Sequence, residues 1–116
     1  MSDNVFDLQE FMERVQNDKE LLLELLDIFT DDYKTKRQLL GEAIEKNDYQ
    51  QVRSIAHSLK GASGNISAKA LRETLMQIED MAKIENLSGI DKLLVILDSQ
   101  YGEFQGRIES LRGKER

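Results

Sequence analysis

IDKLLVILDSQYGEFQGRIESL, the segment from residue 90 to residue 111, carries the strongest structural signal in this chain. Its apolar residues recur in alternating steps of four and three, at Ile90, Leu94, Leu97, Tyr101, Phe104, Ile108 and Leu111. This spacing keeps one side of a helix apolar, because an α-helix turns once in about 3.6 residues. A long helix with one apolar side is typical of helical bundles, in which each helix packs lengthwise against its neighbours.

The same helical period runs through the rest of the chain, and strict alternation never lasts for the length of a strand. We expect a short helix over residues 5–16 and longer helices over about 17–46 and 47–65, with two more before the C-terminus. Polar residues that can cap a helix mark four of the starts: Asn17, Asn47, Ser67 and Ser88. The prediction is an all-α fold, an antiparallel four-helix bundle with an additional short N-terminal helix, forming a single domain over residues 1–116.

Periodicity also predicts which residues of the second and fourth helices lie in the core. In the second helix they are Leu22, Leu25, Leu26, Phe29, Tyr33, Leu40, Ala43 and Ile44. In the fourth they are Leu71, Leu75 and Ile78, with Met81 or Ala82.

Composition excludes several classes of function. The formal net charge of −6 argues against general nucleic-acid binding, which needs a basic surface. Cysteine is absent, so the chain has no disulfide and no thiolate metal site. The strongest apolar stretch, residues 21–29, contains two acidic residues and is too short to cross a bilayer. The first ten residues contain no lysine or arginine, unlike a secretory signal. We expect a cytoplasmic protein that binds neither nucleic acid nor membrane.

His57 is the only histidine, and the helical period predicts which way it faces. With about 100° per residue, the residues within roughly 40° of the side opposite His57 are all apolar. These are Val52, Ile55, Leu59, Ala62 and Ile66. Within roughly 60° of His57 lie two cations, Arg53 and Lys60, and two glycines, Gly61 and Gly64. The imidazole is therefore expected on the solvent-facing side, among positive charges and small residues.

This environment suits a phosphoryl acceptor. A neutral imidazole nitrogen is a nucleophile near neutral pH, because its ordinary pKa is about 6.5. Neighbouring cations can stabilise the negative charge of an attached phosphoryl group. Each glycine costs the helix about 1 kcal/mol relative to alanine, and a partner that must approach the backbone would explain that cost. Geometry alone leaves a second interpretation open, in which His57 is an ordinary surface residue and Gly64 helps to end the helix.

The segment AHSLKGASGNIS, Ala56 to Ser67, resembles the signature of histidine-containing phosphotransfer (HPt) domains. In that family an alanine precedes the phosphorylated histidine, which is followed by a variable residue, an apolar residue, lysine and glycine. FMERVQNDKELLLELLDIF, residues 11–29, resembles the junction of the family's first two helices. The resemblance implies that His57 is phosphorylated, that Lys60 is its basic neighbour and that Gly61 gives partners access. One position departs from the family: Ser67 replaces the usual glycine, and we expect it to cap the next helix.

The resemblance further implies a carrier in a phosphorelay. Such a protein accepts a phosphoryl group from the aspartate of one receiver domain and passes it to another, in response regulators and hybrid sensor histidine kinases. The carrier needs no cofactor of its own, since the receiver supplies Mg²⁺ and the acidic pocket. No nucleotide-binding motif accompanies His57, so autokinase activity is not expected. We expect a monomer in which Arg53 adds charge support and Gly64 shares the access role of Gly61.

Other functions fit the sequence less well. A nucleophilic serine (Ser54, Ser58 or Ser63) lacks a recognisable acid–base partner, and a di-iron or zinc site lacks ligands. A binding module that docks receivers without carrying phosphate would have no chemical need for His57. A structural helical protein that oligomerises through its last helix would be distinguished by sedimentation.

Overall fold

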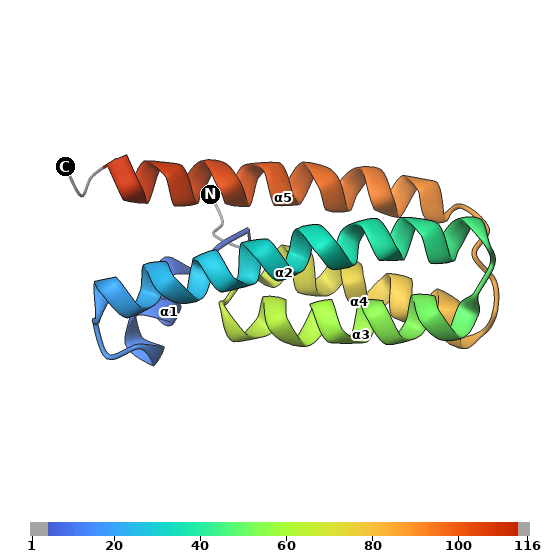
Figure 1. Ribbon diagram of the computed structural model, residues 1–116, viewed down its shortest axis with the longest axis horizontal. Helices are drawn as coiled ribbons and strands as arrows, with labels where there is room; N and C mark the ends of the chain where they lie inside the picture. The colour runs from blue at the N-terminus through green and yellow to red at the C-terminus, as the bar shows by residue number, and fades with distance from the viewer. Residues whose placement is uncertain (1–4, 114–116) are drawn as a thin grey trace.

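The computed structural model describes residues 5–113, which form five helices and no strand. They are α1 (Leu8–Arg14), α2 (Lys19–Glu45), α3 (Tyr49–Asn65), α4 (Lys69–Lys83) and α5 (Ile90–Gly113). The four long helices run in alternating directions along one axis, and α1 lies at one end of the bundle (Figure 1). This confirms the predicted all-α, antiparallel four-helix bundle with a short additional N-terminal helix. Among the described helices, none has the length and apolar character needed to cross a membrane.

The core follows the predicted apolar pattern closely. On α5, the residues Ile90, Leu97, Phe104 and Ile108 are buried, and the other three members of the pattern are partly buried. Phe104 is the centre of an aromatic cluster, with its ring 5.3 Å from that of Phe6. Of the core residues predicted for α2 and α4, Leu25, Ile44 and Met81 are only partly buried and the rest are buried. These long apolar contacts hold the helices parallel to the bundle axis and stabilise the surface that carries His57.

The predicted helix caps were wrong by one residue at three junctions. Asp18 and Asp48, rather than the asparagines before them, cap α2 and α3 by accepting hydrogen bonds from backbone amides at 3.0 Å and 3.2 Å. Asn17 and Asn47 instead adopt positive φ values of 62° and 52°, a conformation that asparagine tolerates better than most residues. Each asparagine therefore makes the turn and leaves capping to the aspartate that follows it.

Ser67 also does not cap a helix, contrary to the prediction. Ala68 occupies the N-cap position of α4 and makes no side-chain capping bond. Ser67 is the turn residue, with a φ of 62°, a backbone conformation that favours glycine. Its hydroxyl donates a 2.6 Å hydrogen bond to Oε1 of Glu10 in α1. The positive φ gives a physical reason for glycine at this position in the HPt family.

Two other helix boundaries differ from the prediction. The first helix occupies only Leu8–Arg14 of the expected residues 5–16. The last helix begins at Ile90, two residues after Ser88, because Gly89 adopts a φ of 79° and ends the preceding turn. Arg14 joins α1 to the rest of the bundle, since its guanidinium donates hydrogen bonds to the backbone carbonyls of Gly64 and Asn65. The short helix is thus attached to the turn between α3 and α4.

Candidate functional site

His57 lies on the exposed side of α3, as the helical period predicts. The opposite side of the helix packs into the core through buried Val52, Leu59 and Ile66, with Ile55 and Ala62 partly buried. The His57 side chain is 68% exposed. Because α3 is held by its apolar side, the imidazole is fixed near the surface without being enclosed.

A buried carboxylate from the neighbouring helix holds the imidazole. Nδ1 of His57 lies 2.8 Å from Oε2 of Glu79 on α4, and the Glu79 side chain is only 4% exposed. An ionised carboxylate can only accept a hydrogen bond, so Nδ1 carries the proton and donates it. Nε2 then keeps its lone pair. The contact therefore leaves Nε2 as the imidazole nitrogen whose lone pair is available to act as a nucleophile.

The ionised state of Glu79 follows from its partners. Burial raises the pKa of a carboxyl group, but hydrogen bonds from Lys60 and His57 and their positive potential outweigh this effect. The pKa of Glu79 is lowered below its ordinary value, so its side chain is an anion at neutral pH. A buried anion in contact with the imidazole is a permanent part of the site.

Lys60 does not point freely into solvent, which corrects the expectation from the helical period. Its Nζ lies 2.8 Å from Oε1 of Glu79, and its side chain is only 20% exposed. The carboxylate of Glu79 thus has one oxygen on Lys60 and the other on His57. The physical reason is that a buried carboxylate needs a counter-ion, and Lys60 is one turn from His57 on the side of α3 that faces α4.

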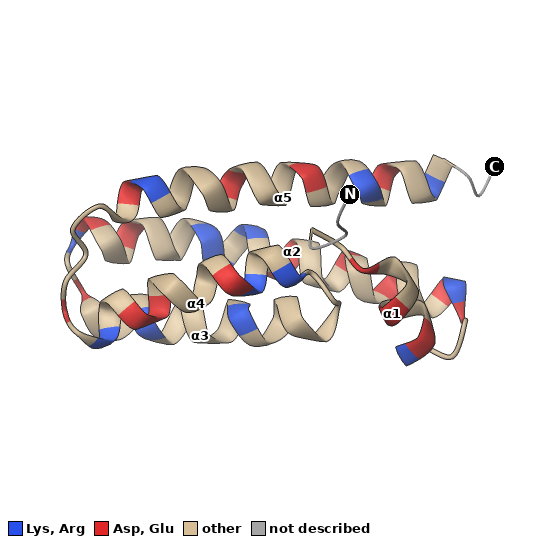
Figure 2. Cartoon of the chain, turned by 180° about the vertical axis from the view of Figure 1, so that it is seen from behind, with Lys and Arg blue, Asp and Glu red and all other residues tan. Residues whose placement is uncertain are grey.

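These groups line a shallow depression of about 430 Å³ between α3 and α4. Its lining residues are Gln50, Arg53, Ser54, His57, Lys60, Glu79 and Lys83. Figure 2 shows basic residues on α3, which has no aspartate or glutamate, and both basic and acidic residues on α4. Arg53 is exposed and shares the depression with His57, as expected from its place one turn earlier on the helix. The depression is open to solvent and every residue that lines it is polar or charged, which suits a small charged group more than an apolar ligand.

The two glycines predicted to flank His57 differ in their surroundings. Gly61 is exposed, and a Cβ built there would meet no atom within 4 Å. The space beside His57 at that position is empty. Gly64 is half-buried, and a Cβ there would lie 3.2 Å from Cδ of Arg72. A side chain at position 64 would need the Arg72 side chain to move by a few tenths of an ångström.

Sequence reasoning did not identify Glu79 or Lys83. Glu79 does carry a recognisable signal, because it lies four residues after Leu75 and three before Ala82, at a core position of α4. A charged residue is almost never buried without a partner, so this position could have suggested a buried ion pair. Lys83 carries no such signal, since lysine near the end of a helix is common.

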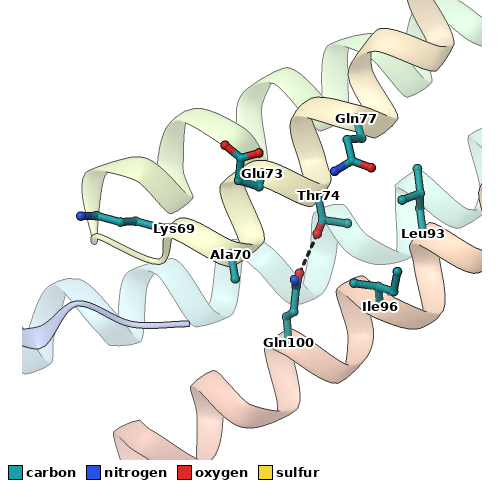
Figure 3. Close-up of a pocket in the computed structure, with 8 residues that line it drawn as sticks. All are labelled: Lys69, Ala70, Glu73, Thr74, Gln77, Leu93, Ile96 and Gln100. Atoms are coloured by element: carbon teal, nitrogen blue, oxygen red, sulfur yellow. Dashed lines mark hydrogen bonds between the residues drawn. The ribbon is translucent and has the colours of Figure 1, made fainter. Parts of the chain in front are cut away.

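A second hollow, of about 560 Å³, lies between α4 and α5 and is separate from the His57 site. Figure 3 shows it, with the hydroxyl of Thr74 donating a 2.8 Å hydrogen bond to the side-chain oxygen of Gln100. Leu93 and Ile96 add an apolar part, and no nucleophile with an acid–base partner lines it. This hollow therefore offers no second candidate for nucleophilic chemistry.

Comparison with known proteins supports the same family as the sequence signature. A model of the Hpt domain matches residues 24–113 of the chain. "Histidine-containing phosphotransfer protein 5" of Arabidopsis thaliana is 22% identical over 100 residues, covering 84% of this chain. The chain spans 64% of that relative's length. The crystal structure of histidine-containing phosphotransfer protein B (HptB) from Pseudomonas aeruginosa PAO1 has a TM-score of 0.89, with 23% identity. That match covers 99% of this chain and 100% of the other, and it shows the same fold.

Proposed function

This chain belongs to the Hpt domain family, and on that premise we propose that it carries a phosphoryl group on His57 in a multistep phosphorelay. It accepts the group from the aspartate of one receiver domain and passes it to the aspartate of another. Its partners are the receiver domains of response regulators and of hybrid sensor histidine kinases. The observation that carries the proposal is the exposed imidazole whose Nδ1 is bonded to buried Glu79.

The chemistry requires one nucleophilic nitrogen and no movement of a proton on this chain. The lone pair of Nε2 attacks the phosphorus of the aspartyl phosphate, and an Nε2–P bond forms. The bond between phosphorus and the aspartate oxygen breaks, and the carboxylate leaves with the electron pair. The proton stays on Nδ1, which donates its hydrogen bond to Glu79 throughout. In the onward transfer the imidazole leaves as a neutral ring with its Nδ1 proton in place.

Charge around His57 supports the phosphorylated state. Arg53 faces the same depression and adds positive potential. Lys60 contributes by cancelling the charge of Glu79, which would otherwise repel a phosphoryl group close to it. Gly61 leaves the empty space through which a receiver approaches, while the access role of Gly64 has no support beyond its small size.

The remaining parts of the proposal follow from what a carrier needs. Mg²⁺ and the acceptor aspartate belong to the receiver, and the carrier uses no cofactor of its own. It acts in the cytoplasm as a monomer and does not phosphorylate itself from ATP. Incubation with labelled ATP alone should leave the protein unlabelled, and sedimentation should give the mass of one chain.

The central test is transfer from a labelled receiver domain. The wild-type protein should gain one acid-labile, alkali-stable phosphoryl group, and His57→Gln should gain none. Glutamine can still donate a hydrogen bond to Glu79, so helical circular dichroism and Tm should change little. A labelled His57→Gln protein would overturn the proposal.

A further inference from the structure

Lys83 lies on α4, one turn after Glu79, and its side chain forms part of the wall of the His57 depression. Its Nζ is 4.0 Å from Oε2 of Glu79 and 4.0 Å from Oδ1 of Asp80, at the outer limit of an ion pair. The side chain is 46% exposed. Lys83 is therefore held only loosely in the unphosphorylated protein.

Lys60 differs from Lys83 in both distance and exposure. Its Nζ is 2.8 Å from Oε1 of Glu79 and its side chain is 20% exposed. The other oxygen of Glu79 already accepts the hydrogen bond from His57. Glu79 thus has a tight counter-ion in Lys60, and it does not need Lys83 for neutralisation.

The balance of charge in the depression leaves a site for a doubly charged anion. Three cations and one carboxylate line it: Arg53, Lys60 and Lys83 against Glu79. Because Lys60 and Glu79 form a tight pair, Arg53 and Lys83 supply the positive charge that is not tightly paired. A phosphoryl group carries close to two negative charges at neutral pH. The two cations lie on different helices, so they would contact the group from opposite walls of the depression.

We infer that Lys83 is the α4 residue that binds the phosphoryl oxygens when His57 is phosphorylated. This inference rests on the proposed function and adds a residue to its site. The flexible four-carbon stem of lysine lets Nζ leave Glu79 and Asp80 and donate charge-assisted hydrogen bonds to the phosphoryl group. Lys60 stays paired with Glu79, so the two lysines have separate roles. Lys60 neutralises the buried carboxylate, and Lys83 binds the phosphoryl group.

The test compares Lys83→Met with wild type and with Lys34→Met. Methionine keeps much of the apolar stem and removes the charge. Lys34 is an exposed lysine of α2 outside the depression, which makes its variant a matched control. The measurements are the rate of transfer from a labelled receiver, the equilibrium fraction on His57 and the Tm. At low salt Lys83→Met should slow transfer and lower that fraction by roughly tenfold. The effect should shrink at high salt, and Lys83→Arg should retain most of the activity.

The outcomes separate this inference from the proposed function. If the wild-type protein accepts no label, the proposed function fails and the inference fails with it. If wild type is labelled and Lys83→Met matches Lys34→Met at low salt, only the inference is overturned. An unchanged Tm in Lys83→Met, together with weaker labelling, supports a direct role toward the phosphoryl group and not a structural one.

Discussion

Nδ1 of His57 lies 2.8 Å from Oε2 of Glu79, and the other oxygen of the same carboxylate lies 2.8 Å from Nζ of Lys60. One buried side chain of α4 therefore contacts two side chains of α3, those of His57 and Lys60. The arrangement selects which imidazole nitrogen is free and prevents Lys60 from extending into solvent. The chemistry of the site depends on how α3 and α4 pack, and not only on the residues next to His57.

Glu79→Gln should lower stability in a pH-dependent way. The pKa of Glu79 is below its ordinary value of 4.5 in the folded protein, so its stabilising effect is present above that value. The effect is lost as the pH falls through the lower pKa of the folded state. At pH 7 the variant should lose about 1–3 kcal/mol in the free energy of unfolding, because a hydrogen-bonded buried anion is replaced. Urea denaturation at pH 7, 5 and 3 would show the difference closing in acid.

The matched control for Glu79 is Glu73→Gln. Glu73 is an exposed residue of the same helix, on the side that lines the hollow toward α5. Its substitution should change the free energy of unfolding little at any pH. An equal loss of stability for Glu79→Gln at pH 7 and pH 3 would contradict the assignment of the effect to the carboxylate's charge.

Lys60→Ala should slow phosphoryl transfer and lower the free energy of unfolding. Removing the ammonium exposes the phosphoryl group to the bare charge of Glu79, and transfer should slow by roughly tenfold to a hundredfold. A solvent-facing lysine would leave stability unchanged, but the buried partner predicts a loss of about 1–3 kcal/mol. Lys60→Arg should retain much of both properties because the charge survives. Transfer time courses at two salt concentrations and urea denaturation of all three proteins test this. If Lys60→Ala matches the wild-type protein in both transfer rate and stability, Lys60 is only a surface residue.

Gly61→Gln should stabilise the protein while slowing transfer. A Cβ at position 61 meets no atom within 4 Å, so the change improves helix propensity by a few tenths of a kcal/mol or more. The new side chain stands beside His57 and obstructs an approaching receiver. Gly102→Gln on α5 is the control, because its Cβ is equally free of contacts. Both variants should melt at or above the wild-type Tm, and only Gly61→Gln should lose transfer rate. Unchanged docking and rate in Gly61→Gln would refute the access argument.

Substitutions of Ser67 would measure how much the left-handed conformation of the turn between α3 and α4 costs in stability. Both Ser67→Ala and Ser67→Gly lose the hydrogen bond to Glu10, but only glycine relieves the positive φ of 62°. Ser67→Gly should therefore be more stable than Ser67→Ala by about 1 kcal/mol. Thermal unfolding of the two variants measures the difference directly. Equal Tm values would mean that the turn changes conformation when Ser67 is replaced.

Local sequence was sufficient to predict the five helices, most of the core residues and the side of α3 that faces solvent. The positions of Leu97, Phe104 and Leu59 follow from the period of a single helix, which needs no information about neighbours. The same argument correctly placed His57 opposite the core and Gly61 on the same exposed side of the helix. It failed at the caps, because Asn17, Asn47 and Ser67 can either cap a helix or form the left-handed turn before it.

The helical period predicts the cations near His57, but only the tertiary structure decided that Glu79 is the partner of both His57 and Lys60. Glu79 is 22 residues from His57 in the chain, and nothing in the helical period of α3 shows which residue of α4 lies opposite. That pairing is set by how the apolar sides of α3 and α4 pack, which brings a carboxylate at a core position of one helix beside the imidazole of the other. Burial then makes the carboxylate require a counter-ion, and this turns Lys60 inward while Lys83 remains loosely held. The period of one helix determines which side chains face solvent, whereas their partners depend on the packing of two.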